Sequence, residues 1–176
     1  AMGSNTTGNY NTAHGSDAVR NNTEGGGNTA TGQGPLYYNT IGTDNTAVGR
    51  FAIRSNTIGS QNTAAGNLAL YSNTTGSLNT ALGESAMNSN TTGSFNVAVG
   101  SQLLNNNTTG SYNVAAGVGA LRSNTTGNSN IAIGSSALLL STNRSNLVAV
   151  GDSALYNNGN GVTIFWQAAA NTAIWS

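Results

Sequence analysis

The sequence is built from a 17-residue repeat, and this period restricts the possible folds more than any other feature. A phrase of the form Asn-Thr-Ala-x-Gly ends at Gly15 and again at Gly32, one period later. The same step connects all the glycines of the series, which are Gly15, Gly32, Gly49, Gly66, Gly83, Gly100, Gly117, Gly134 and Gly151. A period that stays constant over so many units indicates one supersecondary element per unit, stacked into a continuous array.

The positions of a unit are numbered here as slots 1 to 17, starting from the Asn of the Asn-Thr-Ala-x-Gly phrase. Slot 3 is always alanine, slot 5 is always glycine, and slot 9 is always aliphatic or methionine. Slots 11 to 15 read approximately Ser-Asn-Thr-Thr-Gly, so most units contain a second glycine. Because glycine costs about 1 kcal/mol relative to alanine in a helix interior, and no helical periodicity survives, the repeat predicts an all-β fold.

We expect each unit to form one coil of a parallel β-solenoid. A short strand over 79–82 ends at a turn at Gly83, slots 8 and 9 supply a second apolar contact, and the Asn-Thr-Thr-Gly turn returns the chain. Glycine suits these turns because it adopts positive φ without a steric penalty. The Asn residues of slot 1, Asn11 to Asn130, are expected to stack their amides from coil to coil; the alternative is a hydrogen-bonding face for a sugar.

The repeat array accounts for most of the chain. Residues 1–4 are interpreted as a remnant of a cloning vector, residues 5–158 as the β-solenoid, and residues 159–176 as an irregular last coil. The interval from Leu147 to Asn171 is longer than one period, so this last coil contains an inserted loop. The loop is either a cap on the open coil end or a binding tip, since both are common where a solenoid ends or is interrupted.

Charge is scarce, and this excludes several classes of function. Charged residues make up 6% of the chain, against about 25% in an average protein. The five basic residues, all arginine, cancel the five acidic ones, so we expect no binding of nucleic acid or of an anionic membrane. No long apolar run and no signal peptide is present, so membrane insertion of this segment is not expected.

Residues suited to catalysis or metal binding are too few to form a site. Cysteine is absent, and His14 is the single histidine, so no Cys or second His can share a metal with it. No phosphate-binding loop occurs. The acidic residues lie in different slots and coils and give no paired carboxylates: Asp17, Glu24, Asp44, Glu84 and Asp152. We therefore expect neither an enzyme, such as a polysaccharide lyase or hydrolase on a β-helix, nor a metal or cofactor site.

The strands are apolar on two faces, which indicates self-association. The interior of one coil holds only an alanine, a second position that is usually alanine, and one Leu-sized side chain. Slots 2 and 4 lie on the opposite face from slot 3, and they change from Thr to Val and Ile along the chain. Such strands require cover on both faces. We expect a homotrimer with this interface: Val97, Val99, Val114, Ile131, Ile133, Val148 and Val150.

Three phrases of the repeat carry a family resemblance. NTALGESAM, NVAVGSQLL and NIAIGSSAL, beginning at Asn79, Asn96 and Asn130, resemble the YadA-like head repeats of trimeric autotransporter adhesins and of bacterial and phage trimeric fibre proteins. The resemblance covers Asn5 to about Asn158, although the unit here is longer by an Asn-Thr-Thr-Gly turn. It implies a left-handed parallel β-roll trimer located outside the cell, at a bacterial surface or in a phage tail fibre.

Aromatic and arginine side chains are the candidates for ligand contacts. Slot 10 contains tyrosines and arginines, and slot 17 contains Tyr10, Phe95 and Tyr112. Such columns can present rings and guanidinium groups to a carbohydrate, or they can support neighbouring coils. The inserted last coil adds Phe165, Trp166 and Trp175. The slot 10 candidates are Tyr37, Tyr71 and Tyr156 together with Arg20, Arg54 and Arg122.

These observations predict a non-catalytic, trimeric segment of a surface fibre or adhesin. Such a segment spaces and presents binding elements and contacts a cell-surface glycan or a protein receptor. The alternative is an ice-binding β-solenoid, because slots 2, 13 and 14 give columns of threonine. Two features count against this alternative: slot 2 changes to an aliphatic residue from Val97 onward, and adjacent threonines point to opposite faces of a strand.

Overall fold

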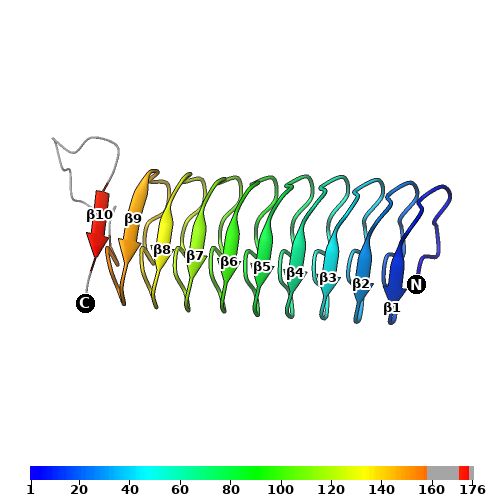
Figure 1. Ribbon diagram of the computed structural model, residues 1–176, viewed down its shortest axis with the longest axis horizontal. Coiled ribbons are helices and arrows are strands. Elements are labelled where there is room, and N and C mark those ends of the chain that lie inside the picture. Colours follow the sequence, from blue (N-terminus) through cyan, green and yellow to red (C-terminus); the bar gives the residue numbers. More distant parts are fainter. Residues whose placement is uncertain (158–170, 175–176) are drawn as a thin grey trace.

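The computed structural model describes residues 1–157 and 171–174, and the ten strands of this part form one parallel sheet. The order of the strands in the sheet is their order in the chain, and no helix occurs in these residues. The predicted parallel β-solenoid is thus confirmed (Figure 1). The strands are β1 (Thr12–His14), β2 (Thr29–Thr31), β3 (Thr46–Val48), β4 (Thr63–Ala65), β5 (Thr80–Leu82), β6 (Val97–Val99), β7 (Val114–Ala116), β8 (Ile131–Ile133), β9 (Leu147–Val150) and β10 (Asn171–Ile174).

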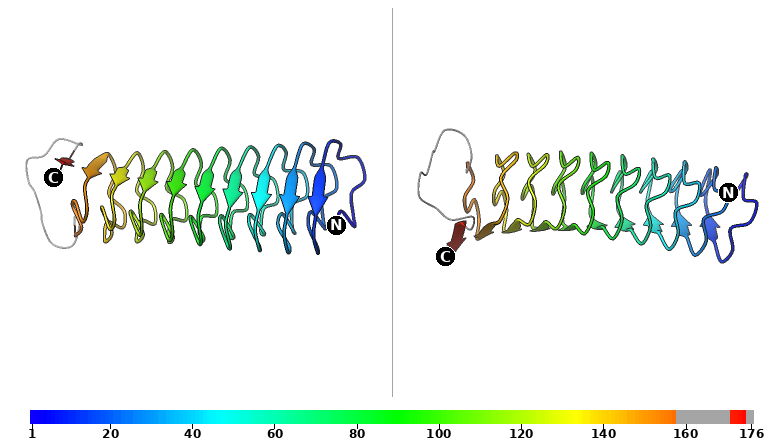
Figure 2. Two further views of the ribbon diagram at one scale, coloured as in Figure 1. Left: turned by 60° about the horizontal axis from the view of Figure 1, so that its bottom comes forward. Right: turned by 90° about the horizontal axis from the view of Figure 1, so that it is seen from above.

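The period of the sequence is the register of the sheet. Ala81 of β5 pairs with Ala98 of β6, and the slots on either side of it pair with the same slots of the next coil. The strands form one side of the rod and the turns form the others (Figure 2). Strand β10 pairs Asn171 with Leu147, so the longer last interval also returns the chain to slot 1, as the sequence indicated.

Backbone hydrogen bonds connect successive coils outside the strands as well. The N–H of Thr74 donates to the carbonyl of Thr91 at 2.9 Å, whereas the N–H of Leu78 donates to the carbonyl of Ser60, one coil earlier, at 3.1 Å. The N–H of Met2 donates in the same way to Ala18. Residues near the N-terminus therefore already follow the path of a coil, and the rod is held along its axis on all sides.

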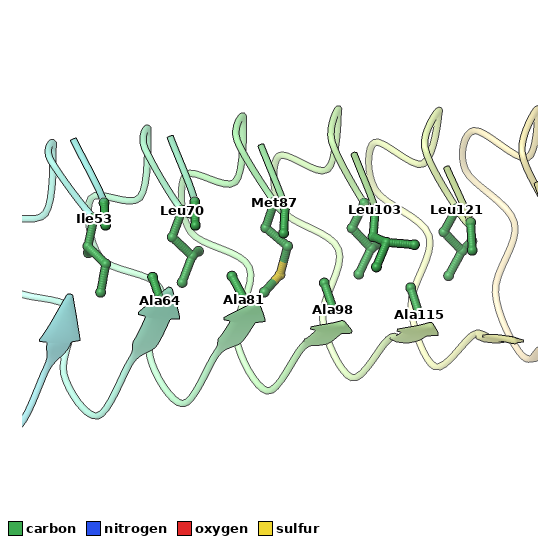
Figure 3. Close-up of a cluster of buried hydrophobic side chains, with 14 of the residues drawn as sticks. Ile53, Ala64, Leu70, Ala81, Met87, Ala98, Leu103, Ala115 and Leu121 are labelled. Carbon is green, nitrogen blue, oxygen red and sulfur yellow. The ribbon is translucent and has the colours of Figure 1, made fainter. Parts of the chain in front are cut away.

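The apolar interior lies between the strand and the opposite wall of each coil. The alanines of slot 3 point from the strands toward the slot 9 side chains, as Ala81 and Met87 do in Figure 3. Both side chains are fully buried, and Ala86, which occupies slot 8 beside them, is fully buried too. The predicted core at slots 3, 8 and 9 is confirmed. It is narrow because alanine is the only residue that slot 3 contains.

Slot 9 also shows a backbone conformation that its residue types disfavour. Its φ angle is 52° at Val19 and 48° at Ile53, and β-branched residues rarely adopt this left-handed region. The same conformation occurs in slots 7 and 17, for example at Phe51 and Tyr112. Stacking in both directions along the rod holds these bends in place, since each is hydrogen-bonded to the coils beside it.

The two glycine series have different physical causes, which corrects part of the sequence interpretation. At slot 5 the φ angle lies between 120° and 142°, so glycine is needed for its backbone freedom, as expected. At slot 15 the φ angle is not positive. There a Cβ atom would overlap with other groups: at Gly76 it would meet Oδ1 of Asn73 and the carbonyl oxygen of Gly93. Slot 15 is glycine because no space remains for a side chain.

Two columns of buried asparagine complete the interior. In slot 12, Nδ2 of Asn73 donates to Oδ1 of Asn56 in the preceding coil and to the carbonyl of Gly76, both at 2.9 Å. In slot 1, Nδ2 of Asn79 donates to Oδ1 of Asn62 at 3.1 Å. The predicted stacking of slot 1 is confirmed. The slot 1 asparagines from Asn28 to Asn130 are fully buried, so their amides offer no face to a sugar. The slot 12 column was not predicted.

Candidate binding surface

A cluster of aromatic side chains surrounds the guanidinium group of Arg54. The Cζ atom lies 5.0 Å from the ring centroid of Tyr37, 5.3 Å from that of Tyr38, 4.9 Å from that of Phe51 and 6.0 Å from that of Tyr71. Each distance falls within the range of cation–π contacts. The sequence placed Arg54 and Tyr71 together as candidates, and the structure brings them together in one cluster.

The repeat geometry positions this cluster. Tyr37, Arg54 and Tyr71 occupy slot 10 of three successive coils, so their side chains follow one another along the rod. Nη1 of Arg54 donates a hydrogen bond to the hydroxyl oxygen of Tyr71 at 3.2 Å. Tyr38 joins from slot 11 and packs edge-on against Tyr37, with ring centroids 4.6 Å apart. Phe51 joins from slot 7 and packs edge-on against Tyr71 at 6.5 Å.

Tyr38 and Phe51 were missed by the sequence interpretation, which compared residues only within a slot. Their slots hold small or polar residues in most other coils, so no column pointed to them. A weak signal was present nonetheless. The coils from Tyr37 to Tyr71 contain four of the aromatic residues and two of the five basic residues of the chain.

Two arginines of this region form no ion pair with an acidic residue in the described part of the chain. Arg50 lies over the ring of Phe51, with its Cζ 4.4 Å from the centroid, and its Nε donates to Oε1 of Gln33 at 3.2 Å. The ion pair found in residues 1–157 joins Arg20 to Asp17 at 2.9 Å, and neither Arg50 nor Arg54 takes part in it. The surface here carries positive charge held by rings and amides.

A second aromatic pair lies in slot 17. The rings of Phe95 and Tyr112 are stacked, with centroids 4.8 Å apart and planes 5° apart. Both are exposed, Tyr112 at 59%, and Leu78 of the preceding coil is exposed beside them in the same slot. Tyr10, the first aromatic residue of the slot, is 93% exposed and stands apart from this pair.

The outer face of strands β6 to β9 is apolar, and it is exposed or half-buried in the single chain. Slots 2 and 4 point outward as predicted, and Val97 is 37% exposed while Ile133 is 43% exposed. Val148 and Val150 in β9 are half-buried. The other side chains expected at an interface are also exposed on this face: Val99, Val114 and Ile131.

Arg20 lies at the edge of the cluster, with its Cζ 5.8 Å from the ring centroid of Tyr37. The other remaining sequence candidates do not join the cluster. Tyr156 and Arg122 are exposed and make none of the aromatic or cation–π contacts found in residues 1–157. Phe165, Trp166 and Trp175 lie outside the described residues. His14 is exposed at the end of β1, and the part of the chain that the structure describes has no group of three or more acidic or histidine side chains able to hold a metal.

The fold and this surface define a parallel β-solenoid repeat protein. No family model, curated protein or solved structure matches the chain. The surface of the described residues contains no pocket, so any ligand of the Arg54 cluster would lie on an open face. Within the same residues no helix is long and apolar enough to cross a membrane.

Proposed function

We propose that this chain is a non-catalytic segment of an extracellular trimeric fibre or adhesin, at a bacterial surface or in a phage tail. It holds binding elements at a distance from their anchor and contacts a glycan or a protein receptor itself. Three left-handed solenoids would pack side by side around the fibre axis. The unbroken coil-to-coil hydrogen bonding supports a spacer role, because a rod of this kind is stiff along its whole length.

The exposed apolar strand face is the observation that carries the proposal. Side chains such as Val97, Val114 and Ile131 project outward from the sheet in three consecutive coils. Contiguous apolar patches of this kind mark sites of protein association. A second and third copy of the chain offer the same face, so a closed ring of three copies covers all of it.

The outward slots become more apolar toward the middle of the rod. After Tyr10, slot 17 contains polar or small residues up to Gln61, then Leu78, Phe95 and Tyr112, and it is polar again at Ser129 and Asn146. Slot 2 changes from Thr to Val one coil after Leu78, and slot 4 is Leu, Val, Ala or Ile from β5 onward. We therefore place the main contacts between chains in the half of the rod from β5 to β9.

The mass of the protein in solution tests this proposal. Light scattering coupled to gel filtration should give about three times the chain mass of 17.7 kDa. Sedimentation velocity on the same sample should agree and should show an elongated particle. A folded monomer over the whole accessible concentration range would contradict the proposal, because its apolar strand face would then be stable in water.

An ice-binding protein is the second candidate, and the threonine column of slot 2 favours it. The consecutive strands β1 to β5 each present a threonine in slot 2 of the outer face, beginning at Thr12 and ending at Thr80. The slot 13 threonines are less suitable, because hydroxyls such as that of Thr74 donate to a carbonyl of the next coil. Thermal hysteresis at millimolar protein would support this function, and its absence would exclude it.

A further inference from the structure

We infer that the Arg54 cluster, defined as Tyr37, Tyr38, Arg50, Phe51, Arg54 and Tyr71, binds a sugar that carries a carboxylate. The ligand class is an acidic saccharide such as a hexuronic acid. This inference rests on the proposed function as a fibre that contacts glycans, and it names the class of glycan and the place where it binds.

The positive charge of the cluster is the first argument. Arg50 and Arg54 lie close together in one coil, and neither takes part in the ion pair found in residues 1–157. In a chain with 6% charged residues, two arginines without a carboxylate partner are a marked concentration of charge. A planar guanidinium group presents paired N–H donors that match the two oxygens of a carboxylate. The ligand therefore supplies the missing anion.

The aromatic rings are the second argument. Tyr38 is 45% exposed, while Tyr37, Phe51 and Tyr71 are half-buried, so part of each ring reaches the surface. Aromatic faces pack against the C–H groups of a saccharide ring and give the flat contact that a site without a pocket requires. Rings and arginines on one surface match a ligand that is both flat and anionic.

The fixed position of Arg54 is the third argument. Four rings and the hydroxyl of Tyr71 hold its guanidinium group, so little side-chain entropy is lost when an anion binds. A single site of this kind is weak. The three copies around the axis of the proposed trimer would raise the avidity, since linked sites gain from effective concentration.

Titration with trigalacturonate tests the inference, with its methyl ester as the neutral ligand and a sulfated neutral trisaccharide as the second anion. Calorimetry or NMR at low salt should show binding of trigalacturonate and at least tenfold weaker binding of the ester. A stronger response to the sulfated sugar than to trigalacturonate would overturn the carboxylate assignment. No binding of trigalacturonate at millimolar concentration would overturn the inference itself.

Substitutions locate the site. Arg50→Gln and Tyr38→Ala change exposed side chains and should each weaken trigalacturonate binding about tenfold, while the melting temperature stays within a few degrees. Arg54→Gln should abolish binding. Arg122→Gln is the matched control, because Arg122 also occupies slot 10 but makes no cation–π contact with the rings of residues 1–157, so binding should stay unchanged. Equal losses in Arg122→Gln and Arg50→Gln would show non-specific attraction and overturn the assignment.

The experiment distinguishes a failure of the trimeric-fibre proposal from a failure of the ligand assignment. The mass of each sample is measured before the titration. A trimer that does not bind trigalacturonate overturns the ligand assignment and leaves the fibre proposal intact. A monomer that binds it, with loss in Arg50→Gln, overturns the trimer and supports the site.

Discussion

A single buried asparagine shows how this chain uses polar residues as core. The slot 12 amide donates two hydrogen bonds through Nδ2. In Asn107, one goes to Oδ1 of Asn90 in the preceding coil and the other goes to the carbonyl of Gly110 in the same coil. Oδ1 of Asn107 then accepts from Asn124. Aspartate has no N–H to donate, and leucine would leave the carbonyl unpaired, so asparagine is the residue that fits.

Asn107→Ala should therefore lower the free energy of unfolding by about 2–4 kcal/mol, because it breaks these hydrogen bonds and leaves buried partners unpaired. Asn106→Ala is the control in the neighbouring position. Asn106 is exposed and its side chain makes no hydrogen bond within the described residues, so the change should stay within about 0.5 kcal/mol. Chemical denaturation followed by circular dichroism compares the two. Similar losses at both positions would mean that the ladder contributes nothing specific.

At the scale of one coil, the sequence departs from the repeat at three positions between Ser141 and Leu147. Serine replaces the slot 12 asparagine, Arg144 replaces the slot 15 glycine, and Leu147 replaces the slot 1 asparagine of the following strand. A side chain at slot 15 would overlap with a slot 12 asparagine, so the first two changes are coupled by sterics. As a result Oδ1 of Asn124 and the hydroxyl of Ser141 are buried without a hydrogen-bond partner.

Because of this coupling, we expect the single and the double variant to change the melting temperature in opposite directions. Ser141→Asn alone should lower the melting temperature, because the new amide meets the Cβ of Arg144. Ser141→Asn combined with Arg144→Gly should raise it by several degrees, because Oδ1 of Asn124 regains a donor at a gain of about 1–2 kcal/mol. Thermal unfolding of the double-mutant cycle measures the interaction. Additive effects would show that the two positions are independent.

The coil also shows what the sequence could predict and what it could not. The strict period predicted the strands, their register and the buried slots 3, 8 and 9, because each residue in a stack of equal units lies next to the residue of the same slot in the next coil. It did not separate the two glycine series, since space between coils is a property of the folded rod. The slot 12 column was interpreted as part of a turn, although it makes up about half of the buried asparagines.

The candidate surface was predictable only in part for a related reason. Arg54 and Tyr71 share a slot, so the period alone places them together. Phe51 reaches the same group from slot 7, where a left-handed backbone at φ 58° redirects the chain, and no periodicity encodes that direction. Contacts across slots depend on the shape of the coil corner, which the sequence does not state.

At the scale of the whole molecule, polarity divides the rod along its length. The strands β1 to β5 present threonine in slot 2, whereas β6 to β9 present valine or isoleucine. The arginines of the Arg54 cluster lie in the first half, away from the apolar strand face of the second. Assembly and ligand contact thus fall on different parts of the proposed fibre, and either can be altered while the other is kept.

Val97→Asp and Ile131→Asp should each prevent trimer formation, because an unpaired carboxylate would be buried between chains at a cost of several kcal/mol. Light scattering should show smaller particles, and thermal unfolding should occur at lower temperature. Thr92→Asp places the same charge at an exposed turn of the same rod and should leave the mass unchanged. A trimer that tolerates both strand substitutions would mean that these side chains face water in the assembly.

The hydrogen bonds between coils run along the rod, and β1 and β10 lie at opposite ends of the sheet. Tension applied to the two ends therefore breaks the hydrogen bonds of one coil at a time, and it does not break all the bonds of the sheet together. Each coil that opens releases one repeat unit, about 55–60 Å of extended chain, while the coils behind it stay folded. Such a rod lengthens in equal steps under load. Each step absorbs part of the energy of a sudden pull, so less force reaches the partner to which the rod is bound.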